Sequence, residues 1–167
     1  MTYRIFQISY LWTKIMVEQR KTEFTIPLKT LIPIKFRRSE DHLILIASHA
    51  FWKERVCNAI LNKETLDITE MLDGRLSDLG HWLDSPQEHP HVSCLSSYHD
   101  LKKRNTEFHI QAGRVAEYLN SKRYDAALRL TDQNSAFESA SNAVIQTIFL
   151  LKKEFDRSIK NKSNHSS

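Results

Sequence analysis

The chain has 167 residues, of which 41% are hydrophobic, and this is enough to form the packed core of one ordinary domain. Three glycines and four prolines argue against the turn-rich chain of a β-sandwich or barrel and favour a helical protein. Two cysteines are too few for a disulfide framework, and the longest charge-free stretch, Ser139 to Leu151, is 13 residues and too short to span a bilayer. We therefore expect a cytoplasmic protein with no membrane span.

The net charge of +4 is unevenly distributed along the chain. Residues 1–38 carry a net charge of +6 and residues 152–167 a net charge of +3, whereas residues 39–151 carry −5. An acidic body is a poor phosphate binder, because nucleic-acid binding depends on clustered cations that release counterions. We expect no nucleic-acid partner, and we interpret the basic ends as solvated tails.

Residues 1–38 differ in pattern from the rest of the chain. Thr22 to Phe36 contains Pro27 and Pro33, which remove backbone donors and prevent a continuous helix. Met1 to Met16 mixes aromatic with charged residues and has no small-residue cleavage site, which argues against a secretory signal. The sequence predicts an N-terminal extension over residues 1–38 that is extended or poorly ordered.

Helical periodicity begins at Ser39, a favoured N-cap residue followed by two acids, and predicts a first helix that ends near Asn62. Its inward face is predicted to comprise Leu45, His49, Trp52, Val56 and Ile60. Ser77 is expected to cap a short helix that begins at Asp78. The two prolines within Asp84 to Pro90 predict a loop.

Two long helices are expected in the second half of the chain. The first runs from about Val92 to Leu119 and has an inward stripe of Leu101, Asn105, Phe108, Ala112, Val115 and Leu119, flanked by His109. Ser121 is expected to cap the second, from about Lys122 to Arg157, with inward residues Ala127, Phe137, Ser141, Val144, Ile148, Leu151 and Phe155. Short connections predict an all-α fold, an antiparallel up-and-down four-helix bundle over residues 39–158, followed by a disordered tail at 159–167.

Eight histidines in a helical protein suggest a metal site. A di-iron carboxylate site is disfavoured, because it needs Glu-x-x-His pairs on two helices and the chain has only one such pair, Glu88 and His91, in the proline-containing loop. Three other patterns occur in order: His49-Ala50-Phe51-Trp52-Lys53, Leu79-Gly80-x-Trp82-Leu83 and Phe108-His109-x-x-Ala112-x-x-Val115. They resemble, in turn, the His-x-x-Trp-Lys, Cys-x-Leu/Phe-Gly-x-Trp and His-x-x-x-His motifs of the bacterial chemoreceptor zinc-binding domain family. The resemblance covers roughly residues 40 to 156.

The resemblance implies a four-helix bundle in which one cysteine and three histidines bind zinc and which acts on a chemoreceptor or a diguanylate cyclase. His49 and His109 fall on the first and last histidine positions of that family. Ser77 falls on the cysteine position and Asn105 on the middle histidine position. A hydroxyl and a carboxamide bring neither a negative charge nor a basic nitrogen to zinc. Further candidate ligands are Asp78, His81, His99, Cys94 and Cys57.

Two hypotheses stay open from the sequence. The first is a non-enzymatic sensory or regulatory module that binds zinc weakly or through a modified ligand set, pairs as a homodimer, and acts in trans on a signalling partner. The second is a metal-free structural or protein-interaction bundle in which His49 and His109 form a hydrogen-bonded polar cluster with Ser77 and Asn105. Neither a nucleophile-elbow motif nor a glycine-rich phosphate loop is found, so we expect no enzyme.

Overall fold

The structure is a computed structural model, and it describes residue 36 and residues 41–164. By its internal contacts the chain divides into residues 1–31 and residues 32–167, and the described residues all belong to the second unit. Seven α-helices lie in this described part: α2 (His42–Asn62), α3 (Ile68–Leu72), α4 (Asp78–Leu83), α5 (Pro90–Ser93), α6 (Ser96–Asn120), α7 (Tyr124–Arg129) and α8 (Ala136–Asn164). Two 3₁₀ turns, η2 (Gly74–Leu76) and η3 (Pro86–Glu88), lie between them, and the described residues form no strand.

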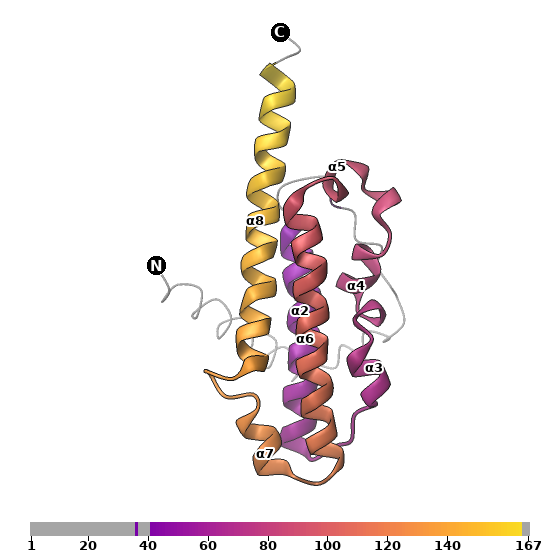
Figure 1. The fold of residues 1–167 in the computed structure, drawn as a ribbon, viewed down its shortest axis with the longest axis vertical. Coiled ribbons are helices and arrows are strands. Elements are labelled where there is room, and N and C mark those ends of the chain that lie inside the picture. Colours follow the sequence, from indigo (N-terminus) through magenta and orange to yellow (C-terminus); the bar gives the residue numbers. More distant parts are fainter. Residues whose placement is uncertain (1–35, 37–40, 165–167) are drawn as a thin grey trace, which may run out of the picture. The chain divides into compact units, whose positions relative to one another are not determined.

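The long helices α2, α6 and α8 lie side by side, and the short helices α3 and α4 pack as a column against α6 (Figure 1). The pairs between α2 and α8 fix their relative direction. Lys53 forms an ion pair with Glu138, His49 a hydrogen bond with Ser141, and the His42 ring contacts Phe149. Residue numbers fall along α2 as they rise along α8, so the two helices run in opposite directions.

The core consists of the faces that the sequence periodicity predicts. Every inward residue predicted for the three long helical segments is buried in the structure. On α2, for example, Leu45 and Val56 are fully buried, and Trp52 is 6% exposed. Positions separated by three or four residues share one side of a helix, so a regular apolar spacing predicts the buried face well.

The prediction of one last helix from about Lys122 to Arg157 is wrong in both bounds: the structure has a short helix, α7, and then α8, which begins at Ala136 and ends at Asn164. Ser121 does not cap a new helix; it ends α6, and its hydroxyl donates to the Glu117 carbonyl. After α7 the chain turns through the polar run 131–135, and α8 begins where the Ser135 hydroxyl accepts from the Glu138 amide. Polar side chains in such a run compete for backbone hydrogen bonds and interrupt the helix. At the other end α8 continues to Asn164, past the expected end near residue 157.

The beginning of the bundle differs in part from the prediction. Ser39 and the predicted boundary at residue 38 lie outside the described residues, and α2 begins after Asp41. Phe36, which the sequence assigned to the extension, is buried: its ring lies 5.9 Å from Trp82 and 5.1 Å from Phe155. The aromatic residue thus belongs to the core at one end of α8.

The segment between α2 and α6 contains the predicted short helix. The Ser77 hydroxyl accepts from the Gly80 amide and so caps α4, as expected. The loop predicted for residues 84–90 contains η3, and α6 begins at Ser96, four residues later than expected, after the single turn of α5. Within the described part of the chain, no helix is both long enough and apolar enough to cross a membrane.

Candidate functional site

The four positions that the family resemblance singled out lie on three different elements of the bundle. His49 is in the middle of α2, Ser77 precedes α4, and Asn105 and His109 lie one turn apart on α6. All four side chains are buried, with exposed fractions of 5% or less. Polar groups this well buried must find hydrogen-bond partners inside the protein.

The backbone of Gly74 lies beside three of these positions, and its carbonyl oxygen accepts hydrogen bonds from two of them. The Ser77 hydroxyl donates to it over 2.8 Å, and the Asn105 amide nitrogen Nδ2 lies 3.4 Å from it. A Cβ atom added to Gly74 would lie 3.0 Å from both Asn105 Nδ2 and His109 Cδ2. We call Gly74, Ser77, Asn105 and His109 the Gly74 cluster.

His109 completes the cluster on α6 and is held in a defined orientation. Its Nδ1 lies 2.9 Å from the Met71 carbonyl, and its ring packs against Trp52 with centroids 5.1 Å apart. Burial lowers the pKa of His109, although the hydrogen bond with Met71 and the charge of Asp73 oppose this effect. The imidazole is therefore neutral near pH 7. Since a carbonyl can only accept, Nδ1 carries the proton and Nε2 is the basic nitrogen.

His49 has its hydrogen bond on the other side of the core. Its Nε2 lies 2.9 Å from the Ser141 hydroxyl of α8, and its ring packs against Phe108 with centroids 4.4 Å apart. Burial, followed by the positive charge of Lys53 and the proximity of His109, lowers the pKa of His49 to about 3. His49 is thus a neutral core histidine whose hydrogen-bond partner, Ser141, belongs to α8 and not to the Gly74 cluster.

The donor set does not fit zinc. A structural zinc site needs about four thiolate, imidazole or carboxylate ligands. At the four family positions only the two histidines have suitable donors, because the Ser77 hydroxyl and the Asn105 amide direct hydrogens at Gly74. The residues described by the structure contain no group of three or more His, Cys, Asp or Glu placed to hold a metal ion.

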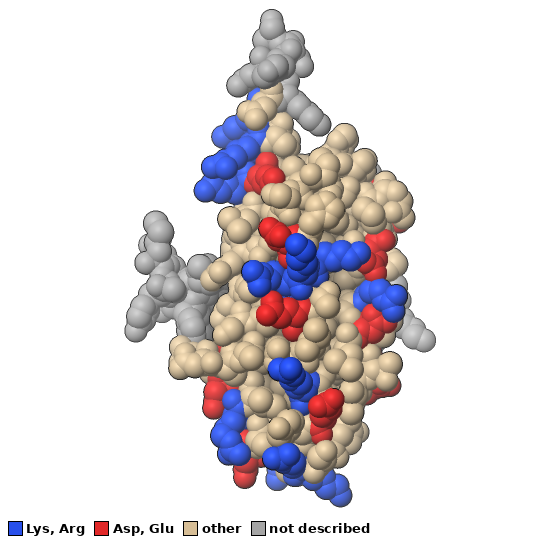
Figure 2. All heavy atoms as spheres, viewed as in Figure 1, with Lys and Arg blue, Asp and Glu red and all other residues tan. Residues whose placement is uncertain are grey.

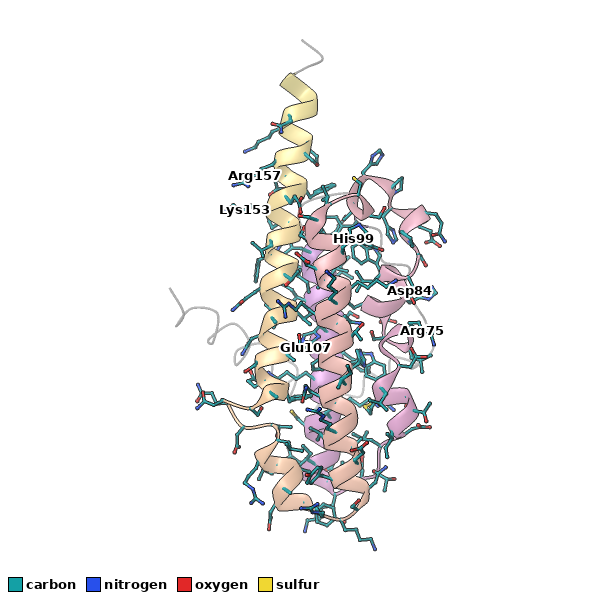
Figure 3. All side chains as sticks on the ribbon, viewed as in Figure 1. Arg75, Asp84, His99, Glu107, Lys153 and Arg157 are labelled. Carbon is teal, nitrogen blue, oxygen red and sulfur yellow. The ribbon has the colours of Figure 1, made fainter. Side chains whose placement is uncertain are left out.

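The further candidate ligands do not complete the set. Asp78, His81, Cys94 and His99 are exposed, and Figure 3 shows His99 near the α5 end of α6. Cys57 is half-buried on α2, and burial raises the pKa of its thiol, which disfavours the thiolate that binds metal. None of the five takes the place of the missing cysteine and histidine.

A shallow hollow opens beside the Gly74 cluster. It encloses about 270 Å³, open solvent included, and its lining contains Gly74, Gly80 and Asn105 together with charged residues. The charged residues of the lining are Arg75, Asp84 and Lys102. Lys102 forms an ion pair of 2.6 Å with Asp84, and Figure 3 shows Asp84 near Arg75. The charges at the hollow are thus largely compensated by one another.

The sequence missed the backbone groups of the site. It singled out His49, Ser77, Asn105 and His109 but not the carbonyls of Met71 and Gly74, since a carbonyl occurs in every residue. The one available signal was the Asp73-Gly74 pair, a dipeptide that is typical of a turn.

Comparison of the chain with protein-family models, with curated proteins and with solved structures gives no match.

Proposed function

We propose that this chain is a non-enzymatic regulatory bundle of the chemoreceptor zinc-binding type, which acts by contact with a signalling protein. The observation that carries the proposal is that Ser77, Asn105 and His109 all lie around one residue, Gly74. These positions come from two motifs that are about 30 residues apart in the sequence. Their meeting supports the kinship that the motifs suggest.

The proposal includes the finer architecture. We take α2, the α3–α4 column, α6 and α8 as the four members of an up-and-down bundle, in which α6 contacts both the column and α8 (Figure 1). In this view the second member is a broken helix. It is interrupted at η2, where the Gly74 carbonyl accepts from Ser77 and Asn105.

Between the two forms of the hypothesis, the metal-free interaction bundle has the better support. Both non-histidine positions already have their hydrogen bonds inside the protein, so the cluster is satisfied without an ion. The zinc-binding sensor is the second candidate. The observation in its favour is His109, whose Nδ1 bond to Met71 leaves Nε2 as the basic nitrogen, the arrangement common in metal-binding histidines.

The proposed partner is a protein, a chemoreceptor or a diguanylate cyclase in the cytoplasm, or a second copy of the chain. On the face shown in Figure 2, basic and acidic side chains lie interspersed over most of the described surface. Lys153 and Arg157 lie along one stretch of α8 (Figure 3), where Figure 2 shows basic side chains with acidic ones beside them. Interspersed charges of both signs favour a protein contact over a nucleic-acid contact.

The test is site-specific photo-crosslinking in cells of the native organism. The photoreactive residue replaces Phe51 on α2 or Leu150 on α8, which are apolar yet 48% and 57% exposed, and Lys103 on α6 serves as the matched control. We expect a crosslink to a chemoreceptor, a diguanylate cyclase or a second copy from one apolar position and not from Lys103. Crosslinks restricted to metabolic enzymes, or equal at all three positions, would contradict the proposal.

A further inference from the structure

The Gly74 cluster has a polarity opposite to that of a metal site. In a metal site, lone pairs converge on a cation. In the Gly74 cluster, the Ser77 O–H and the Asn105 N–H converge on a carbonyl oxygen, which carries a partial negative charge. The side chains at the cysteine and middle-histidine positions thus supply hydrogens where a metal site supplies electron pairs.

Two glycines lie where this carbonyl packs against α4 and α6. A Cβ on Gly80 would lie 1.7 Å from the Gly74 oxygen and 2.6 Å from its carbonyl carbon, so only glycine at position 80 lets η2 pack on α4 in this way. A Cβ on Gly74 would in turn meet Asn105 and His109 at 3.0 Å. The close approach of the carbonyl to α4 therefore requires glycine at position 80, and a side chain at position 74 would press on Asn105 and His109.

We propose that the Gly74 carbonyl takes the place of the ion in this bundle, so that η2 and α4 are joined to α6 by hydrogen bonds and the packing of these helices is independent of metal. The inference rests on the proposed function, because it assumes the kinship with zinc-binding bundles. It adds that metal does not control the contact with the partner: the bundle is held permanently in one packing. A change in zinc concentration then has no differential effect on its conformation.

The proposal predicts that two substitutions convert the cluster into a zinc site. In Ser77→Cys/Asn105→His, both hydrogen donors to Gly74 are replaced by zinc ligands, and His109 supplies a third close by. The probe is zinc chloride alone, added to untagged full-length chain. The readouts are zinc per chain after gel filtration, by elemental analysis, and the melting temperature with and without EDTA.

We expect the double variant to retain about one zinc per chain and to melt several degrees lower in EDTA, because a ligand bound to the folded state raises its stability. The wild type should retain less than about 0.1 zinc per chain, with equal melting temperatures in zinc and EDTA. Ser139→Cys/Gln146→His, a pair of exposed positions on α8, is the matched control and should retain none.

Two results would overturn the inference. One is a folded double variant, judged by circular dichroism, that binds no more zinc than the control, since the positions would then not converge. The other is tight zinc binding by the wild type, which needs no variant to fold. Neither result bears on the crosslinking experiment, which tests the proposed function. If the wild type is metal-free but crosslinks to none of the expected partners, the proposed function is contradicted and the inference about the Gly74 cluster is not.

Discussion

The packing of Gly80 on Gly74 gives a prediction that can be worked from the structure. In Gly80→Ala, the new methyl group would lie 1.7 Å from a backbone oxygen, so the chain at η2 or α4 must move. Movement there would also separate the Ser77 hydroxyl from Gly74. The matched variant is Gly113→Ala on α6, where the methyl group would meet the Leu72 side chain, with Cδ2 at 2.3 Å and Cγ at 2.7 Å, and no backbone atom is among its nearest neighbours.

The two substitutions share one favourable effect and differ in the unfavourable one. Alanine in a helix is more stable than glycine by about 1 kcal/mol. Overpacking against fixed atoms costs about 1–3 kcal/mol and occasionally more. Leu72 is 45% exposed and can rotate away, so Gly113→Ala should change the free energy of unfolding by less than about 1 kcal/mol. Gly80→Ala meets backbone, so its cost should lie at the upper end of that range and, less the gain from alanine, leave a net destabilisation of about 2 kcal/mol.

Thermal unfolding followed by circular dichroism separates these expectations. At about 2–4 °C per kcal/mol for a chain of this length, Gly80→Ala should lower the melting temperature by about 4–8 °C. Gly113→Ala should stay within about 4 °C of the wild type. A Gly80→Ala variant as stable as the wild type, or a larger loss in Gly113→Ala, would refute the close approach of the Gly74 carbonyl to α4.

Three further predictions concern buried or capping groups. The folded state lowers the pKa of His49 from 6.5 to about 3, so the unfolded chain binds more protons between these pH values. The free energy of unfolding should therefore fall as the pH drops from about 6.5 towards 3, by up to about 1.4 kcal/mol per pH unit from this residue. In urea unfolding at a series of pH values, His49→Gln should flatten this slope. Burial raises the pKa of Glu154, but hydrogen bonds from Ser96 and Ser97 at the start of α6 outweigh burial and lower that pKa below 4.5. The stabilisation by Glu154 is therefore present above pH 4.5 and is lost on acidification. Glu154→Gln should cost about 1 kcal/mol at pH 7 in urea unfolding, whereas Glu107→Gln, at an exposed position, should cost almost nothing. Tyr98→Phe removes a buried hydrogen bond of 2.8 Å and should cost about 1 kcal/mol, and since burial raises the pKa of this phenol to about 12, no tyrosinate absorbance from it should appear below pH 11.

The inward faces of the long helices could be predicted from sequence because burial follows the helical period. Leu101, Phe108 and Val115 recur at seven residues on α6, and all three are buried. The same spacing placed Asn105 inside the bundle and His109 beside it, although neither is apolar. Patterning of this kind depends on single elements and needs no knowledge of the neighbours.

The break before α8 could not be predicted in the same way. Ser121 and Ser135 are equally good N-cap residues by type, and only the structure shows that the first ends α6 and the second begins α8. The choice depends on where the chain must reverse to bring Phe137 into the core. That requirement is a property of the whole bundle and not of the local sequence.

The Gly74 cluster lies between these two cases. Its side chains could be named from the motifs, but the acceptor that joins them is a backbone oxygen with no residue-specific signal. Its position depends on η2, a turn of three residues whose path is set by packing on α4 and α6. Sequence reasoning therefore found the donors and missed what they bind.

Zinc content of the untagged wild-type chain tests the central claim most directly. The protein is incubated with micromolar zinc, gel-filtered and measured by elemental analysis, with His49→Ala and His109→Ala in parallel. A cluster centred on the Gly74 carbonyl predicts less than about 0.1 zinc per chain in all three proteins, because too few ligands are present. About one zinc per wild-type chain, lost in both variants, would contradict the account and restore the zinc sensor.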